Sequence, residues 1–180
     1  ATTFLLPHEI DTGKIILQKK IEILNDHNAV TTHAKLNVLG AGMVTETVDL
    51  LLEDKIDAVP QEKLLSPETE LKSAPKIFRE TCQLDLGMTV GNAHNFVRGL
   101  SPYPAAWAEL KFPEQAETLV LKIFETKPEI TAHNLKPGTF LSDGKKEAKM
   151  ARTDGYLHLI NIQTPGKKRM NTGDYLRGLH

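Results

Sequence analysis

The most constraining feature of this sequence is a dense series of short apolar segments separated by glycine turns, from residue 105 onward. Gly138, Gly144 and Gly155 lie between or beside these segments, and glycine tolerates the positive φ that tight turns need. Five strands so closely spaced favour a small closed or partly open β-barrel, and an OB-like barrel, a fold that often binds oligonucleotides, is the simplest candidate. The predicted strands are 107–112, 118–126, 137–142, 147–152 and 155–163.

The first third of the chain has a different pattern. Residues 2–6, 15–17 and 21–23 are apolar and partly β-branched, which predicts strands, and Asp11-Thr12-Gly13 between them indicates a turn. Residues 31–53 carry apolar side chains at spacings of three and four, the period of an amphipathic helix. The chain is therefore predicted to be α+β rather than all-β.

A polar, acidic stretch with three prolines separates the two patterns. Pro60, Pro67 and Pro75 punctuate residues 57–75, which have no clear period and are typical of a linker. We therefore predict a first domain over 1–56, a linker over 57–75 and a second domain over 76–180. A short helix over 89–98 is expected near the start of the second domain.

Charge is unevenly divided between the halves of the chain. Residues 1–90 carry nine basic and fourteen acidic side chains, whereas residues 91–180 carry thirteen basic and nine acidic ones. A basic C-terminal half is suited to a polyanion such as nucleic acid. Charge alone is equally compatible with an ordinary mixed, solvated surface.

Several classes of function are disfavoured. The longest apolar runs are too short to span a bilayer, and no signal peptide is visible at the N-terminus. Cys82 is the single cysteine, so no internal disulfide can form and a reducing compartment is favoured. The seven histidines show no metal-ligand spacing, so no metal site is predicted. Asp-Thr-Gly also occurs in aspartic proteases, but Lys14 replaces the small residue that usually follows, and the long helix does not fit that fold.

Longer motifs carry a specific resemblance. The run Arg98-Gly99-Leu100-Ser101-Pro102-Tyr103-Pro104-Ala105-Ala106-Trp107 closely resembles the methionyl-tRNA formyltransferase family. Further matches to that family lie, in order, at 8–18, 74–77, 94–97 and 163–170. The resemblance covers nearly the whole chain, and implies the end of a formyltransferase domain followed by an OB-like C-terminal barrel. Leu86 departs from it, because the family usually has Trp after Asp85.

The resemblance implies a reaction and a catalytic residue. The family moves the formyl group of 10-formyltetrahydrofolate to the amino group of methionine carried by initiator tRNA, using an Asp, an Asn and a His. Asp11 matches the Asp, which would accept a proton from the attacking amine. The Asn and His belong to an Asn-x-His motif well upstream of the Asp, within about the first two-fifths of the family's length, and this sequence has no match to that stretch. The chain alone is therefore expected to be inactive.

The resemblance also implies that the second domain contacts tRNA. Its surplus of basic side chains would neutralise phosphates without reading bases, whereas Arg98, Tyr103 and Trp107 are interpreted as fold-forming. The candidate RNA contacts are Lys145, Lys146, Lys149, Arg152, Lys167, Lys168 and Arg169.

Further expectations concern location, partners and alternatives. A cytoplasmic location without a membrane partner is expected, and so is self-association through exposed strand edges of the first domain. A sugar-nucleotide formyltransferase fragment and a stand-alone RNA-binding module remain alternative functions.

Overall fold

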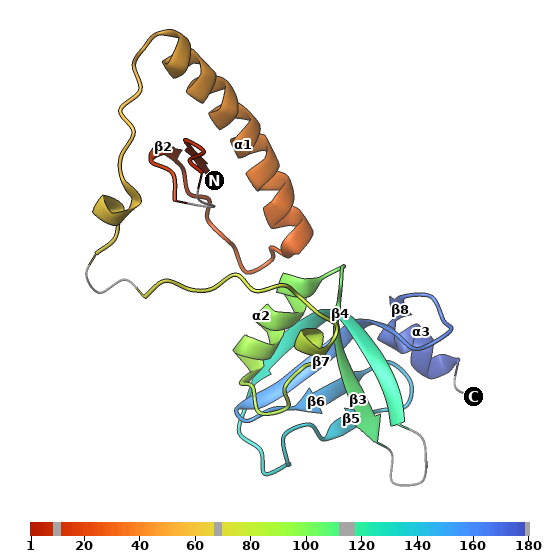
Figure 1. Cartoon of the computed structure of the whole chain (residues 1–180). Coiled ribbons are helices and arrows are strands. Elements are labelled where there is room, and N and C mark those ends of the chain that lie inside the picture. The colour runs from red at the N-terminus through yellow and green to blue at the C-terminus, as the bar shows by residue number, and fades with distance from the viewer. Residues whose placement is uncertain (9–11, 67–69, 112–117, 179–180) are drawn as a thin grey trace. The chain divides into compact units, whose positions relative to one another are not determined.

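The computed structural model describes residues 1–8, 12–66, 70–111 and 118–178 (Figure 1). The chain divides into two compact units, Ala1–Pro75 (unit 1) and Lys76–His180 (unit 2). Unit 1 contains a long helix and a hairpin, and unit 2 contains a curled sheet with helices beside it (Figure 1). The predicted α+β class is therefore confirmed.

Unit 1 starts with a short antiparallel hairpin. Strand β1 (Thr2–Phe4) pairs with β2 (Ile15–Gln18), with an irregularity in register between Thr3 and Phe4. Residues beyond the predicted end of the first domain also belong to this unit, because Ile15 and Val59 exchange two backbone hydrogen bonds of 2.8 Å. A 3₁₀ helix at Gln61–Leu64 follows them. The strand predicted at 21–23 is absent, and those residues form irregular chain.

Helix α1 (Ala29–Leu52) matches the helix predicted over 31–53, and starts two residues earlier and ends one residue earlier. Asn28 caps it through a reciprocal pair with Thr31: Thr31 N–H donates to the Asn28 side chain, and Asn28 N–H donates to Thr31 Oγ1 at 2.8 Å. Such a capping box fixes the start of a helix by bonding amide groups that would otherwise lack partners. The sequence therefore sets this boundary locally.

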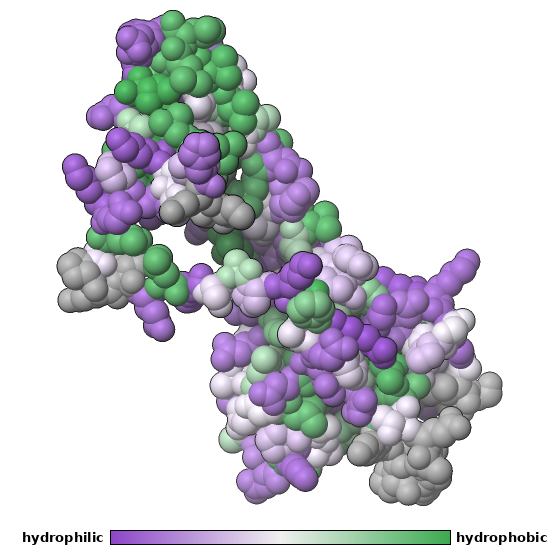
Figure 2. Space-filling view, in the orientation of Figure 1, coloured by the Kyte–Doolittle hydropathy of each residue, from purple (hydrophilic) through white to green (hydrophobic). Residues whose placement is uncertain are grey.

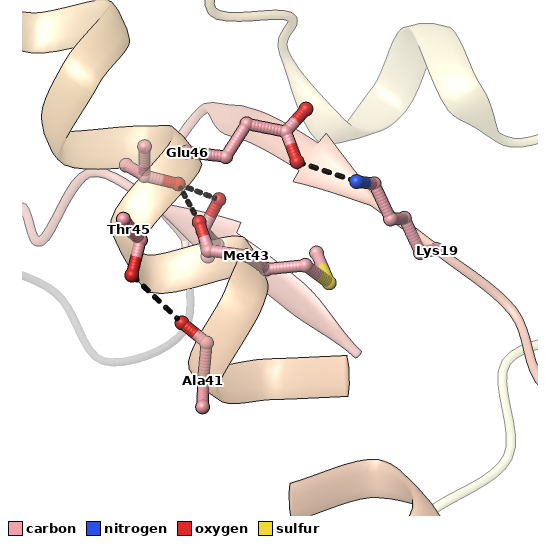
Figure 3. Close-up of polar contacts among 7 residues, drawn as sticks. Lys19, Ala41, Met43, Thr45 and Glu46 are labelled. Atoms are coloured by element: carbon pink, nitrogen blue, oxygen red, sulfur yellow. Dashed lines mark hydrogen bonds and ion pairs between the residues drawn. The ribbon is translucent and has the colours of Figure 1, made fainter. Parts of the chain in front are cut away.

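A few side chains fix α1 to the hairpin (Figure 3). Glu46 of α1 forms an ion pair with Lys19, which follows β2. Thr47 Oγ1 is 2.9 Å from Thr3 Oγ1 of β1 and donates to Met43 O at 2.7 Å. Met43 is 1% exposed, so the hairpin covers only a narrow strip of the helix.

The rest of the helix surface keeps apolar side chains in solvent. Val38 is 78% exposed and Leu52 is 81% exposed, and Val44, Val48 and Leu51 are also exposed. Figure 2 shows hydrophobic residues gathered on the outside of this unit. A soluble helix usually buries one such face, so α1 carries more apolar surface than unit 1 can cover.

Unit 2 contains an antiparallel sheet whose path among the described strands is β3-β4-β7-β6-β5, with β8 also paired to β7. Its pairing does not close into a ring among the described residues, so the sheet forms a partly open barrel (Figure 1). The strands are β3 (Ala106–Lys111), β4 (Thr118–Ile130), β5 (Phe140–Ser142), β6 (Ala148–Ala151), β7 (Gly155–Gln163) and β8 (Met170–Asn171).

The core of unit 2 lies between the concave side of the sheet and helix α2 (Val90–Leu100). Ala93 and Val97 of α2 pack with Leu121 and Ile123 of β4 and Leu157 of β7, and each is 0–1% exposed. Spacings of three and four in α2 and of two in the strands place these residues on one side of their elements. The predicted helix over 89–98 is confirmed, with Thr89 as its cap.

Two features of unit 2 differ from the expectations. The two-residue strand β8 and helix α3 (Thr172–Arg177) were not predicted, because each is too short to show a period. Tyr103, interpreted as fold-forming, is not packed into the unit, since it is 86% exposed. Trp107 does have a structural contact, because its indole N–H donates to Arg79 O at 2.8 Å.

Candidate nucleic-acid interface

The predicted catalytic residue, Asp11, lies outside the described residues. The following glycine has a clear structural role: a Cβ on Gly13 would lie 1.7 Å from Leu5 O. Gly13 O also accepts a 2.8 Å hydrogen bond from the Gln61 side chain. Glycine is required here because the two backbones of the hairpin approach too closely for any side chain.

The predicted RNA contacts Lys145 and Lys146 lie in the turn between β5 and β6. One oxygen of Asp143 accepts backbone N–H bonds from Lys145, Lys146 and Glu147 at 2.8–2.9 Å. The amides of Glu147, Lys146 and Lys145 lower the pKa of Asp143 to about 2. The turn is therefore held in one conformation, with both lysine side chains exposed.

Lys149 of β6 belongs to a polar cluster on the outer side of the sheet. Glu129 of β4 lies 2.6 Å from His158 Nε2 and 3.3 Å from Lys149 Nζ, and these two hydrogen bonds lower its pKa. Lys149 Nζ lies 3.9 Å from the centre of the Tyr156 ring, and His133 stacks on that ring at 4.6 Å. Lys149 is thus held in place more firmly than an isolated surface lysine.

The three basic residues of the tail, Lys167 to Arg169, lie in the exposed turn between β7 and β8. Arg169 lies over the Phe124 ring at 4.6 Å, and Lys167 over the Tyr175 ring at 5.7 Å. Cation–π contacts of this kind orient a cation while leaving it accessible to an anion. These residues therefore present charge from an ordered turn.

Arg152 was predicted to contact RNA, but its side chain does not lie on the surface. Its side chain is 0% exposed and donates from Nη1 to Asp85 O at 2.9 Å. Nε and Nη2 have no hydrogen-bond partner among the described residues. Burial lowers the pKa of Arg152 to about 10, while Asp85 acts in the opposite direction. Because this guanidinium cannot reach a phosphate from inside the unit, we leave it out of the candidate interface.

Sequence reasoning missed two members of the outer face. Lys127 of β4 pairs across the sheet with His158 of β7, and His158 pairs in turn with Lys149 of β6. Lys127 and His158 also line a hollow of about 350 Å³ together with Lys146 and Glu147. The two-residue alternation of strands places Lys127 outward, but the pairing between strands cannot be read from one sequence.

The described residues also bear on two other classes of site. None of the groups of His, Cys, Asp and Glu side chains in the described part of the chain is arranged to hold a metal ion. Among those same residues, no helix is long and apolar enough to cross a membrane.

Comparison with solved structures places this fold among known ones. A variant of HypX from Aquifex aeolicus has a TM-score of 0.64 at 16% identity, over 97% of this chain and 30% of that protein. HypX in complex with tetrahydrofolic acid has a TM-score of 0.60 at 15% identity, over 97% of this chain and 29% of that protein. At these identities the likeness concerns the fold alone.

Sequence comparison then identifies the family. Residues 76–180 match the family model of the formyl transferase C-terminal domain. The methionyl-tRNA formyltransferase of Bacteroides fragilis is 48% identical over 99% of this chain, and that of Parabacteroides distasonis is 49% identical over 98%. The chain spans about half the length of these relatives, 55% and 54% respectively. The chain therefore belongs to the formyltransferase family whose members carry this C-terminal domain.

Proposed function

We propose that this chain is part of an enzyme that formylates the amino group of methionine on initiator tRNA, in the cytoplasm, with 10-formyltetrahydrofolate as donor. The observation that carries the proposal is its 48% identity over 99% of its length to a relative named methionyl-tRNA formyltransferase. That a protein of similar fold, HypX, is known in complex with tetrahydrofolic acid supports a folate donor.

The residues present do not make a folate site by themselves. Small-molecule sites are enclosed and mostly apolar, whereas Met43 is the only hydrophobic side chain that unit 1 buries among its described residues. The two Asn-x-His tripeptides in the sequence, Asn25–His27 and Asn92–His94, both follow Asp11, whereas the family's motif lies well upstream of the matching Asp. We therefore propose that the 180 residues alone neither bind the donor tightly nor turn over, and measurable formylation by the purified chain would contradict this.

Asp11 is the proposed catalytic residue of the whole enzyme. A carboxylate there would accept the proton that the amine loses as it attacks the formyl carbon. In a protein of the relatives' full length, Asp11→Asn should preserve the fold and lose most of kcat, because an amide cannot accept that proton. A kcat near the parental value would remove Asp11 from the mechanism.

The proposed role of unit 2 is to hold tRNA by its phosphates. The candidate contacts that remain are exposed or half-buried and lie in ordered turns and on β6: Lys145, Lys146, Lys149, Lys167, Lys168 and Arg169. Neutralising phosphates releases counterions, so the affinity for tRNA should fall linearly with salt on a log–log plot. Because such contacts carry no base information, this chain should not distinguish the initiator from other tRNAs.

The test is an anisotropy titration of tRNA at several salt concentrations. Replacing Lys167, Lys168 and Arg169 together with Ala should weaken binding to every tRNA and reduce the salt slope by about two to three. A control variant that removes the same charge from unit 1, at Lys55, Lys63 and Lys72, should bind as the parent does. Equal binding and an equal slope for both triple variants would mean that the tail is ordinary surface.

We also propose that unit 1 recruits another chain when it is not covered. Apolar side chains on α1 and the short, open-edged hairpin provide the surface for this association. Sedimentation of the purified chain should show a dimer that dissociates when Val44 and Val48 are replaced by Ser. A monomer whose first 25 or so residues are well protected from hydrogen exchange would contradict this proposal.

A further inference from the structure

Unit 2 has a second concave surface, formed where the segment before α2 lies beside β3 and β4. We call it the aromatic groove. It has a volume of about 300 Å³, at the lower end of the range for small-molecule sites, which suits a group the size of one nucleobase. Its lining includes Phe78, Arg79, Cys82, Tyr103, Trp107 and Lys122.

Two aromatic rings of the groove are unusually exposed to solvent. Tyr103 is 86% exposed and Phe78 is 58% exposed, although neither is needed to fill the core. Large aromatic side chains gathered on a surface usually mark a binding site. Because Tyr103 lies in the short segment that joins α2 to β3, its backbone is placed by two ordered elements.

The walls of the groove are held rigidly. Phe78 O accepts hydrogen bonds from Thr81 Oγ1 at 2.8 Å and Cys82 Sγ at 3.2 Å, and Phe78 N–H donates to Thr81 Oγ1 at 3.0 Å. Trp107 is fixed by its 2.8 Å bond to Arg79 O. The backbone at Phe78 and the Trp107 ring are therefore already held in place before a ligand enters, which lowers the cost of ordering this part of the groove.

The charge of the groove is positive. The Arg79 guanidinium lies 5.5 Å from the centre of the Trp107 ring, and Lys122, which pairs with Trp107 across the strands, is exposed at the edge. Among the described lining residues none carries a carboxylate. Exposed aromatic rings with adjacent cations and no acid suit a ligand that is both flat and anionic.

We propose that the aromatic groove binds the bases of an unpaired RNA strand, with Tyr103 and Phe78 as stacking surfaces and Arg79 and Lys122 as phosphate contacts. Base stacking on aromatic side chains, with cations along the backbone, is how proteins hold single strands without sequence preference. In a paired helix the bases stack on one another, so they are not available to stack on aromatic side chains of the protein. The inference rests on RNA being the ligand of unit 2, and adds where an unpaired stretch of that RNA binds.

The chain contains its own reporter for this test, because Trp107 is its single tryptophan. A short unpaired oligoribonucleotide should quench Trp107 fluorescence in the 180-residue chain, and a fully paired duplex of equal length should not. Tyr103→Ala should weaken binding of the unpaired strand about tenfold, and Tyr103→Phe, which keeps the ring, should stay close to the parent. Ile130→Ala, which removes an exposed apolar side chain outside the groove, serves as the control.

The outcomes separate this inference from the proposed function. If tRNA binds with a salt-dependent affinity but unpaired RNA leaves Trp107 fluorescence unchanged, the groove proposal fails and phosphate binding stands. Equal quenching by duplex and single strand would also overturn it. Failure of any RNA to bind would remove the proposed RNA-holding role of unit 2, and the groove proposal with it. Quenching by an acidic peptide rich in aromatic residues, but not by RNA, would assign the groove to a protein partner.

Discussion

Unit 1 lays a 24-residue helix against two short strands and buries one hydrophobic side chain among its described residues, Met43. Unit 2 buries a single cluster of twelve such residues, drawn from α2 and four strands of one sheet, with Leu84 before the helix. Burial of apolar side chains is the dominant favourable term in folding, and it must offset the conformational entropy that is lost when each residue is ordered. Unit 2 therefore has the means to hold its own fold, and unit 1 depends on apolar surface from elsewhere.

The largest effect is expected when the two units are produced separately, which tests whether each folds on its own. Residues 76–180 should unfold in one cooperative thermal transition, and residues 1–75 alone should show none, because one buried methionine cannot offset the ordering of a whole helix. Circular dichroism and hydrogen exchange of the two pieces would measure this. A cooperative transition in residues 1–75 would refute the comparison outright.

A backbone position in unit 2 should produce the next largest effect. A Cβ on Gly155 would lie 2.0 Å from Glu129 O, where β7 pairs with β4. Gly155→Ala should therefore lower the free energy of unfolding of unit 2 by about 4 kcal/mol, at the extreme of single substitutions. Gly91→Ala in α2, where a Cβ meets nothing within 4 Å, is the matched control and should change stability by less than about 1 kcal/mol. Chemical denaturation would compare them.

Two buried methionines allow a direct comparison between the units. Met43 and Met150 are 1% and 0% exposed. Met150→Ala should cost about 3 kcal/mol, because it leaves a cavity in a packed core. Met43→Ala should leave the main unfolding transition unchanged and only increase hydrogen exchange in α1. If both substitutions shift the midpoint of the main transition equally, the two units unfold together.

The smallest expected effect is a pH dependence of the stability of unit 2. Burial, and then the nearby charge of Arg98, lower the pKa of His94 in the folded state, and His94 Nδ1 lies 2.9 Å from Thr126 Oγ1. The unfolded chain therefore takes up the proton first, so stability should be full above about pH 6.5 and fall as the pH drops below it. His94→Gln should remove this slope between pH 7 and 5. An unchanged slope in that variant would assign it to other groups.

Local sequence signals predicted most elements well. Strand β7 was predicted with its observed ends, since Gly155 and the polar residues after Gln163 bound an alternating segment. Helix α1 has a capping box in its sequence, and α2 has a cap at Thr89. The missed elements, β8 and α3, depend on packing against β7 rather than on their own period. Local signals therefore suffice for the longer elements, whereas α3 was missed although Asn171 caps it, because six residues show no period.

The candidate site was less predictable than the fold. Arg152 and Lys149 are both basic residues of the strand predicted over 147–152. The Arg152 side chain nevertheless turns inward and donates to Asp85 O. Lys127 and His158 meet Lys149 only because β4, β7 and β6 are neighbours. Leu86, which departs from the family pattern, lies against Gly138, where a Cβ would be 2.7 Å from its Cδ1. Such contacts join residues far apart in sequence, so composition cannot reveal them.

The start of α2 depends on a residue far along the chain. Val90 N–H donates to the Asp154 side chain at 2.7 Å, and Asp154 O accepts from Thr131 N–H at 3.2 Å. Sixty-four residues separate Val90 from its partner, so this bond has a high contact order. During synthesis from the N-terminus, α2 must emerge from the ribosome with this amide unbonded. The first turn of α2 therefore has its Thr89 cap from the start, but gains the bond to Asp154 only when the turn before β7 has also been made.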